Sequence, residues 1–436
     1  MKQLRNVEDY NFAYSVLRYI VDLYVKCSYR KFKIYGRENI PKDGAVIYAP
    51  NHCNSLMDPL VVLTIGHERK VFVARADIFR KPAIRKILTF LKIMPINRKR
   101  DGIRSVRNTA DTIKKSIRVL NNQVKFCILP EGTHRAKHSL LPIGKGIARI
   151  SYGANEEMGK EKPIYIVPVG LEYGDYFRFR STVLVQIAKP INITEYIGAN
   201  MEQGEHNIME GIRELVKNAL KEKIVYVEDN EDYDAVWELS KLKTGSICKY
   251  SLLKRFKANK QYIAQIEQFK AEAPQKASVL FEKVNHFIEE RKKAQIGTNS
   301  IVKHNALLNS ILSTFMLILV LPVFAIMTAV SWPVILSNEV AVSKVKDRAF
   351  HNSFRCGITL VLWTLMFIVY VIILFCTLRW YYALGASILL WPAPMLVYDY
   401  FEIVRNCASS WRWLFNRKLK ALYHELLNLL NIYKYE

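Results

Sequence analysis

The chain carries Ala45-Val46-Ile47-Tyr48-Ala49-Pro50-Asn51-His52-Cys53-Asn54-Ser55-Leu56-Met57-Asp58-Pro59, an apolar run that leads into a polar turn. The run Ala45–Ala49 is short, rich in apolar residues and followed by proline, which predicts a buried strand. Such a strand would bring His52 to its end, with Asp58 one or two turns later. A neutral imidazole can take a proton from a hydroxyl, and a nearby carboxylate can fix its tautomer. These residues predict a base with a carboxylate partner, although a histidine that only caps a helix would fit them too.

Short β-rich runs alternate with helical stretches from Lys33 to about Ile193. The strands expected after the first are Val71–Ala74, Ile93–Ile96, Val124–Leu129, Ile164–Val169 and Val183–Ile187. Between two of them, Ile103–Leu120 repeats apolar residues every three or four positions, which indicates a helix with one apolar face. Strands interleaved with helices predict a layered α/β domain, which we place at residues 33–200.

Candidate site residues follow the other strands at their carboxyl ends, where α/β sheets bind ligands. They are Asn97 and Arg98 after one strand, Glu131, Gly132, Thr133 and Arg135 after the next, and Lys145 at the start of a later helix. A lysine near the exposed N–H groups of a helix start suits phosphate. Several cations beside a potential base indicate an anionic substrate whose hydroxyl is activated.

The composition favours a membrane partner. Lys and Arg number 64 and Asp and Glu 39 among 436 residues, a net charge of +25. Such an excess fits nucleic-acid phosphates or anionic lipid head groups. Three segments contain no charged residue, namely 306–336, 357–378 and 381–398. We therefore expect anionic lipid, and no nucleic acid, against the basic surface.

The C-terminal part, residues 304–436, is predicted to be a helical membrane region with a basic tail. A spanning helix takes about 20 residues, so the second and third uncharged segments predict a hairpin, 357–398. The first, 306–336, is long for one span and short for two, and Pro322 lies in its middle. The basic loop 337–356 and the tail prefer the cytoplasmic side. Both lie there, together with the catalytic domain, if segment 306–336 re-enters or lies shallowly.

Two further regions are expected to be helical. Residues 1–32 contain polar residues every three or four positions between Phe12 and Cys27, which on a helix form one narrow stripe. This amphipathic helix could lie in the membrane interface with its stripe facing water, or pack on the catalytic core. Residues 201–303 lack strand patterns and predict a helical connector or cap.

At four ordered blocks the chain resembles the glycerolipid O-acyltransferases, which acylate glycerol-3-phosphate or lysophosphatidate. The blocks are Asn51-His52 with Asp58-Pro59, Ile96-Asn97-Arg98, Pro130-Glu131-Gly132-Thr133 with Arg135, and Val167-Pro168-Val169. The resemblance covers about Tyr35 to Ile193. Most members place four residues between the histidine and the aspartate, whereas this chain places five. The longer form resembles the eukaryotic branch that acylates glycerol-3-phosphate or dihydroxyacetone phosphate.

The resemblance implies a mixed-sheet acyltransferase domain with His52 as general base and Asp58 as the residue that orients it. The acceptor alkoxide would attack the thioester of acyl-CoA or an acyl carrier protein, with no cofactor, no metal and no acyl intermediate on Cys53. The acceptor phosphate would be held by Arg98, Arg135 and Lys145. The acceptor pocket would be shaped by Asn97, Glu131, Gly132 and Thr133. Two other histidines, His134 and His138, have no role in the family and are expected at the surface or in turns.

The expected protein is thus an integral membrane acyltransferase of phospholipid synthesis whose catalytic domain faces the cytoplasm. Its partners would be the acyl donor, a glycerol phosphate acceptor and anionic membrane lipids. The acceptor could be glycerol-3-phosphate, dihydroxyacetone phosphate or lysophosphatidate. A non-catalytic membrane adaptor with a basic lipid-binding face is the alternative. A hydrolase that activates water through His52 and Asp58 is disfavoured by the absence of a metal-ligand cluster or a G-x-S-x-G turn.

Overall fold

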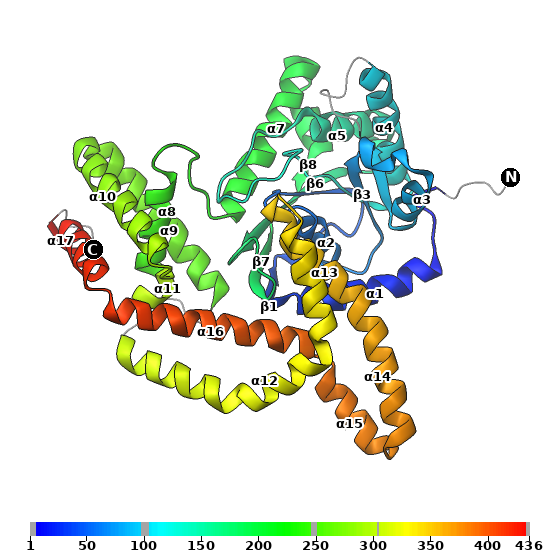
Figure 1. Cartoon of the computed structure of the whole chain (residues 1–436). Helices are drawn as coiled ribbons and strands as arrows, with labels where there is room; N and C mark the ends of the chain where they lie inside the picture. Colours follow the sequence, from blue (N-terminus) through cyan, green and yellow to red (C-terminus); the bar gives the residue numbers. More distant parts are fainter. Residues whose placement is uncertain (1–5, 97–103, 246–250, 303–304, 433–436) are drawn as a thin grey trace. The chain divides into compact units, whose positions relative to one another are not determined.

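The computed structural model describes residues 6–96, 104–245, 251–302 and 305–432. The chain divides into two units (Figure 1). The first comprises Met1–Ile224 together with Ala341–Leu360, and the second comprises Val225–Val340 together with Val361–Glu436. The expected boundary at residue 200 is therefore corrected to Ile224. In addition, a segment assigned above to the membrane region belongs to the first unit.

A mixed sheet forms the centre of the first unit. Its strands are β1 (Tyr29–Tyr35), β2 (Ala45–Pro50), β3 (Lys70–Arg75), β4 (Ile93–Ile96), β5 (Lys125–Cys127), β6 (Ile164–Tyr173), β7 (Ser181–Ile187) and β8 (Ile191–Asn192). They lie in the order β1-β7-β6-β2-β5-β3-β4, with β8 beside β6. The neighbouring strands β6, β2, β5, β3 and β4 all run parallel to one another. Strands β7 and β8 run antiparallel to β6. The predicted mixed-sheet α/β fold is confirmed.

All six predicted strands are present, whereas β1 and β8 were not expected. Strand β1 has the sequence Tyr-Arg-Lys-Phe-Lys-Ile-Tyr, and most of its side chains are partly or fully exposed. Because it pairs only with β7, at the end of the strand order, it lies at a sheet edge where basic residues remain in water. Its basic residues interrupt the apolar pattern by which the other strands were predicted, so this strand was not expected.

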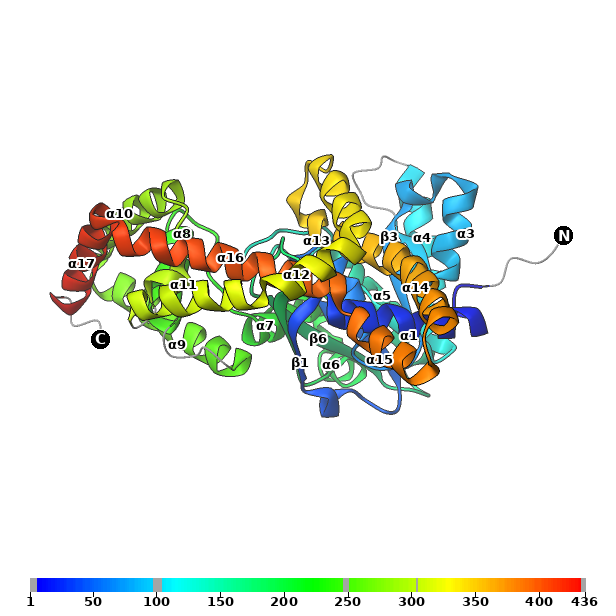
Figure 2. The same cartoon turned by 60° about the horizontal axis from the view of Figure 1, so that its bottom comes forward.

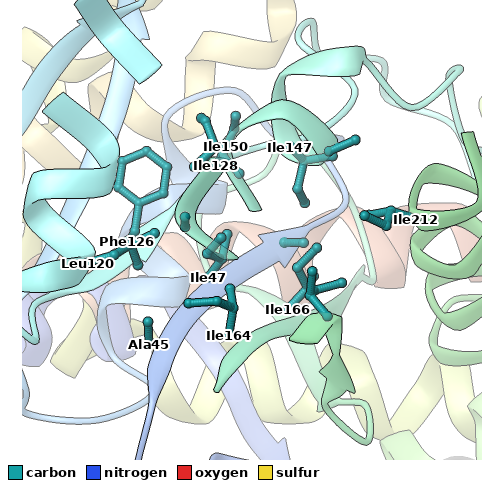
Figure 3. Close-up of a cluster of buried hydrophobic side chains, with 14 of the residues drawn as sticks. Ala45, Ile47, Leu120, Phe126, Ile128, Ile147, Ile150, Ile164, Ile166 and Ile212 are labelled. Atoms are coloured by element: carbon teal, nitrogen blue, oxygen red, sulfur yellow. The ribbon is translucent and has the colours of Figure 1, made fainter. Parts of the chain in front are cut away.

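The hydrophobic core lies between the sheet and the helices α4 (Arg104–Asn121), α5 (Lys145–Met158) and α7 (Gly204–Lys223) (Figure 3). Ile47 of β2 and Ile166 of β6 meet Ile147 of α5 and Ile212 of α7 there, and all four side chains are fully buried. Helix α7 belongs to this core through apolar residues on one face, and this is the physical reason for the later domain boundary. The shorter helices of this unit are α2 (Met57–Leu63), α3 (Pro82–Phe90), α6 (Ile193–Ala199) and α13 (His351–Ile358).

Helix α1 (Phe12–Cys27) packs on the first unit, and the middle of its polar stripe faces the protein. Arg18 and Asp22 of the stripe are buried. The Arg18 guanidinium donates to the backbone carbonyls of Leu63, Gly66, His67 and Glu68, which lie at the end of helix α2 and just after it. Large apolar side chains point outward instead, with Phe12 72% and Tyr19 62% exposed. Of the two positions left open for this helix, the structure shows the one packed on the protein, because backbone carbonyls accept the terminal NH₂ groups of Arg18.

The second unit contains helices joined by loops, and no strand, in its described residues. Its first helices are α8 (Tyr233–Thr244), α9 (Leu252–Glu272), α10 (Pro274–Lys293) and α11 (Thr298–Ile301). Most residues of α12 (Ala306–Ser343) follow in this unit, then α14 (Thr364–Thr377), α15 (Trp380–Leu390), α16 (Ala393–Phe415) and α17 (Arg417–Ile432). Helices α12 and α16 run side by side (Figure 2). Phe324 stacks on Tyr400 with ring centroids 3.9 Å apart, and the Trp411 indole donates to Thr314.

The predicted membrane region differs from expectation in two ways. Helix α12 is one curved helix of 38 residues that continues through Pro322 and Pro333, so the segment is not broken (Figure 1). The second arm of the predicted hairpin is not one helix, because α15 ends before Pro392 and meets α16 at a bend of 41°. In the described residues two helices are long and apolar enough to cross a membrane, and three if the bent pair counts as one span.

Candidate active site

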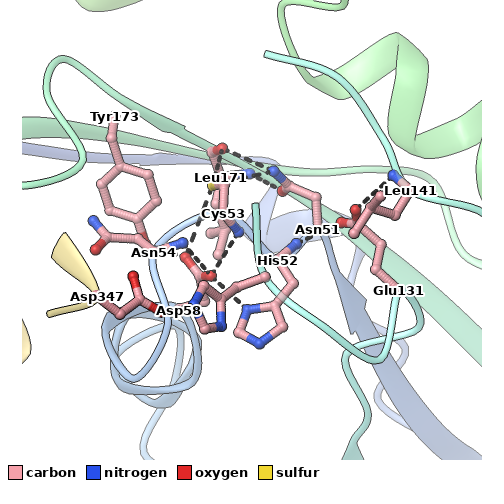
Figure 4. A network of polar contacts seen from close by, with 11 residues as sticks. Asn51, His52, Cys53, Asn54, Asp58, Glu131, Leu141, Leu171, Tyr173 and Asp347 are labelled. Carbon is pink, nitrogen blue, oxygen red and sulfur yellow. Dashed lines mark hydrogen bonds and ion pairs between the residues drawn. The ribbon is translucent and has the colours of Figure 1, made fainter. Parts of the chain in front are cut away.

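The parallel strands bring several predicted residues to one edge of the sheet (Figure 4). His52 follows β2, Glu131 follows β5, and Tyr173 ends β6. Because β5, β2 and β6 are neighbours and parallel, their carboxyl ends meet. Asp58 comes from the first turn of α2 and points back at this edge.

The Asp58 carboxylate is the centre of the site and is completely buried. Its Oδ2 atom lies 2.8 Å from Nδ1 of His52 and accepts the backbone N–H groups of Cys53 at 2.8 Å and Asn54 at 2.7 Å. Its Oδ1 atom accepts the hydroxyl of Tyr173 at 2.7 Å. All these partners are donors, so the carboxylate fixes a proton on Nδ1 of His52. The Nε2 atom of the ring is thereby left as the acceptor.

The five-residue spacing between His52 and Asp58 is compatible with this pair because of the turn between them. Ser55 has a φ of 45°, a left-handed conformation that residues other than glycine rarely adopt. The turn ends at α2, whose first turn carries Asp58. Five intervening residues therefore still allow a bond of 2.8 Å.

Glu131 clamps the backbone that carries the base. One of its oxygens accepts the N–H of His52 at 2.6 Å and the other accepts the N–H of Leu141 at 2.7 Å. Burial raises the pKa of this carboxyl from 4.5 to about 7. Both carboxyl oxygens thus accept backbone N–H groups, and Glu131 holds the backbone of His52 in place.

The raised pKa of Glu131 predicts a pH dependence of stability. Between about pH 4.5 and pH 7 the folded carboxyl holds a proton that the unfolded chain has released, so stability falls as pH rises through this window. Glu131→Gln removes the titration and sets an amide NH₂ against one backbone N–H, which costs roughly 1–3 kcal/mol. Thermal unfolding of the solubilised protein at several pH values should show a lower Tm and a flatter pH dependence. Glu202→Gln, at an exposed position, is the control, and a wild-type pH slope in the Glu131 variant would contradict the assignment.

Cys53 lies beside the pair and is buried. Burial, with a further contribution from the Asp58 carboxylate, raises the pKa of the Cys53 thiol well above its usual value. A thiol held in its protonated form is a poor nucleophile. This agrees with the expectation that Cys53 forms no acyl intermediate.

The predicted phosphate ligands are placed differently from one another. The Arg135 guanidinium donates to the hydroxyl of Ser139 at 2.8 Å, and its backbone N–H donates to the carbonyl of His52. Lys145 begins α5, and its ammonium lies 3.8 Å from Glu210 of α7. Two further predicted site residues, Asn97 and Arg98, follow β4 and lie outside the described residues. Arg135 is therefore bonded to the backbone of His52, whereas Lys145 pairs with Glu210 of α7.

The turn after Glu131 is open to solvent. Gly132 and Thr133 are exposed. Gly132 has a φ of 67°, a conformation that glycine adopts without strain, and no atom lies within 4 Å of a Cβ built there. In the described part of the chain, no group of three or more His, Cys, Asp or Glu side chains is placed to hold a metal ion.

Sequence reasoning missed three contacts of this region. Tyr173 was taken as part of no motif, although it follows the block Val167-Pro168-Val169 on the same strand. His138, expected at the surface or in a turn, is buried with Nδ1 3.2 Å from Glu172, so it does not lie at the surface. The ring of His134 lies 5.5 Å from the ring of His52 between centroids. The alternation of residues along β6 could have indicated Tyr173, whereas no local pattern indicated the other two.

Comparisons with known proteins identify the domain that carries this site. Residues 31–172 match the family model described as Acyltransferase. A 1-acyl-sn-glycerol-3-phosphate acyltransferase of Borreliella burgdorferi is 30% identical over 121 residues, which are 28% of this chain and 46% of that protein. Glycerol-3-phosphate O-acyltransferase 2 of Saccharomyces cerevisiae is 30% identical over 109 residues, 25% of this chain and 14% of that protein. The chain thus spans less than half the length of these relatives.

A structural comparison adds the 1-acyl-sn-glycerophosphate acyltransferase of Thermotoga maritima, with a TM-score of 0.35 and 22% identity over 48% of this chain and 80% of that one. The resemblance drawn from the four sequence blocks is confirmed by the family model and the two sequence relatives. The chain contains an acyltransferase domain, and its His52–Asp58 pair and Glu131 lie within the matched residues.

Proposed function

We propose that this chain is a membrane-bound O-acyltransferase that transfers a fatty acyl group from acyl-CoA or an acyl carrier protein to glycerol-3-phosphate or 1-acylglycerol-3-phosphate. The single observation that carries the proposal is the 2.8 Å contact between His52 Nδ1 and the buried Asp58 carboxylate, at the carboxyl edge of the sheet of an acyltransferase domain. This contact orients a neutral imidazole with its Nε2 atom available to a hydroxyl.

The proposed chemistry is a direct transfer. Nε2 of His52 takes the proton of the acceptor hydroxyl as its oxygen attacks the thioester carbonyl. The C–S bond then breaks, and the departing thiolate takes a proton from the imidazolium, which restores the base. The Asp58 carboxylate, held in place by the backbone N–H groups of Cys53 and Asn54 and by the Tyr173 hydroxyl, stabilises the transient imidazolium.

An acyl-transfer assay separates this function from its alternatives. The purified protein in lipid vesicles is given radiolabelled acyl-CoA or acyl carrier protein, with glycerol-3-phosphate, with 1-acylglycerol-3-phosphate, with dihydroxyacetone phosphate or with no acceptor. An acylated product that requires one of the acceptors supports the proposal. Free fatty acid in every reaction would indicate a hydrolase. A protein that binds anionic vesicles and releases no product would be an adaptor.

We further propose that α12 lies along the membrane surface and does not cross it. At about 1.5 Å per residue its 38 residues extend roughly 57 Å, nearly twice the hydrocarbon thickness. Its last residues, from Ala341, belong to the catalytic unit. Its first residues follow α10 and α11, and no candidate span lies between the catalytic domain and α12 in the described residues. Both ends are thereby connected to the side that carries His52.

Cysteine labelling tests this topology. Single cysteines at Lys292 and Ser343, in a background without native cysteines, are expected to react with an impermeant thiol reagent in sealed vesicles to the same extent as His206→Cys. All three positions are exposed, and His206 lies on α7 of the catalytic unit. A helix that crossed the bilayer would place Lys292 and Ser343 on opposite sides. Labelling of only one of these two positions before the vesicles are permeabilised would therefore contradict the surface position.

A further inference from the structure

The segment Ala341–Leu360 belongs to the catalytic unit although it lies far beyond the acyltransferase domain in sequence. It is joined to that unit by specific contacts. The Arg348 guanidinium lies 4.7 Å from the ring centroid of Phe177, and Arg355 donates to the Phe177 carbonyl at 3.3 Å. The buried thiol of Cys356 accepts the hydroxyl of Ser28 at 3.1 Å. This segment is therefore part of the structure around the candidate active site.

Asp347 of this segment lies beside the site, where Figure 4 labels it. The Oδ1 atom of Asp347 accepts the N–H of Ala349 at 2.9 Å, in the cap of a short 3₁₀ turn, Arg348–Phe350. The Oδ2 atom lies 3.0 Å from Nε2 of His134. The Ala349 N–H and the nearby His134 hold the pKa of Asp347 below its usual value. The ionised carboxylate is thus oriented by its own turn and fixes a proton on Nε2 of His134.

His134 lies between this segment and the base. Its ring meets that of Phe350 edge to face, with centroids 5.4 Å apart and an interplanar angle of 90°. On another side it meets the ring of His52 at 5.5 Å and 67°. A pair as exposed as His134 and Asp347, with Asp347 54% exposed, contributes little to folding stability. The pair matters more for the orientation of the His52 ring. Asp58 bonds this ring at Nδ1 only, and one bond leaves the ring free to rotate about it.

We propose that Asp347 and His134 are positioning residues for His52. In this arrangement a second carboxylate–histidine pair holds the His134 ring against the His52 ring and limits the directions in which Nε2 of the base can point. The inference rests on the function proposed above. It assigns part of the active-site geometry to a segment that begins in the last turn of the long apolar helix α12.

Steady-state kinetics of Asp347→Asn and His134→Ala test the inference. Each should lower kcat by roughly three- to thirtyfold, because a misoriented base loses rate without losing substrate, and both KM values should stay within about twofold. His134→Gln, which keeps a donor for Asp347, should recover part of the rate. Asp77→Asn is the control, since Asp77 is an exposed carboxylate paired with Arg75 in the same unit. An unchanged kcat in Asp347→Asn, or a change confined to the KM for the phosphorylated acceptor or for acyl-CoA, would overturn it.

Double variants separate this inference from the proposed function. If the pair acts through His52, then Asp347→Asn should add nothing to the defect of His52→Ala, and His134→Ala should add little to that of Asp347→Asn. A multiplied loss of rate in the His52→Ala background would overturn the positioning role. By contrast, a protein that lacks acyl transfer altogether, or keeps it fully in His52→Ala, would refute the function proposed for the site itself.

Discussion

Replacing His52 by alanine is expected to lower the rate of acyl transfer by about 10²–10⁴, which is the usual contribution of a general base. The His52 side chain is only partly buried, so its removal should not unfold the domain. The loss should appear in kcat, since the imidazole acts on the hydroxyl during the reaction. Turnover of purified protein in vesicles, with saturating acceptor and donor, measures it.

The control for this variant is His206→Ala, which removes an exposed histidine from α7. Flotation with liposomes should show that both variants bind membranes as the unmodified protein does, because the exposed apolar helices are unchanged. A His52→Ala protein with near-normal kcat would exclude the imidazole as the base. The 2.8 Å contact with Asp58 would then be a structural hydrogen bond only.

Local patterns predicted the sheet and the pair within it. The runs that become β2 and β4 are short, apolar and bounded by turn residues, and the structure begins and ends them within a residue of expectation. The same holds for the helix α4, whose apolar face repeats regularly. His52 and Asp58 could be predicted because they are close in sequence and joined by one turn. Such features depend on neighbouring residues, which the sequence displays directly.

Contacts between distant segments could not be predicted in this way. The stripe on α1 faces the protein because Arg18 meets carbonyls some fifty residues later, which no periodicity reveals. Helix α7 is polar on most of its surface, and only its packing against α5 and β6 assigns it to the catalytic unit. Asp347 comes within bonding distance of His134 across 213 positions of sequence. Apolar composition indicated a membrane region, but composition does not say whether an apolar helix crosses a bilayer or lies on it.

Asp58→Asn is expected to reduce kcat by a similar factor, about 10²–10⁴, while the fold is retained. The amide oxygen can still accept the N–H groups that now point at Oδ2, and the amide NH₂ can donate to the Tyr173 hydroxyl oxygen in place of Oδ1. What the variant loses is the negative charge, so the imidazolium formed on His52 is no longer neutralised. Asp58→Ala is a poorer test, because it leaves buried N–H donors without an acceptor at roughly 1–3 kcal/mol each.

Three measurements on the same preparations make this test decisive. Thermal unfolding should show that Asp58→Asn remains folded, and the KM for each substrate should change much less than kcat, because the Asp58 side chain is fully buried and acts through His52. Tyr173→Phe removes one hydrogen-bond donor to Asp58 and keeps the charge of Asp58, so the kcat of this variant should fall only severalfold. Asp43→Asn, at an exposed position, should behave as the unmodified protein. Equal losses in the Asp58 and Tyr173 variants would show that the hydrogen-bond network, and not the charge, is what the reaction requires of Asp58.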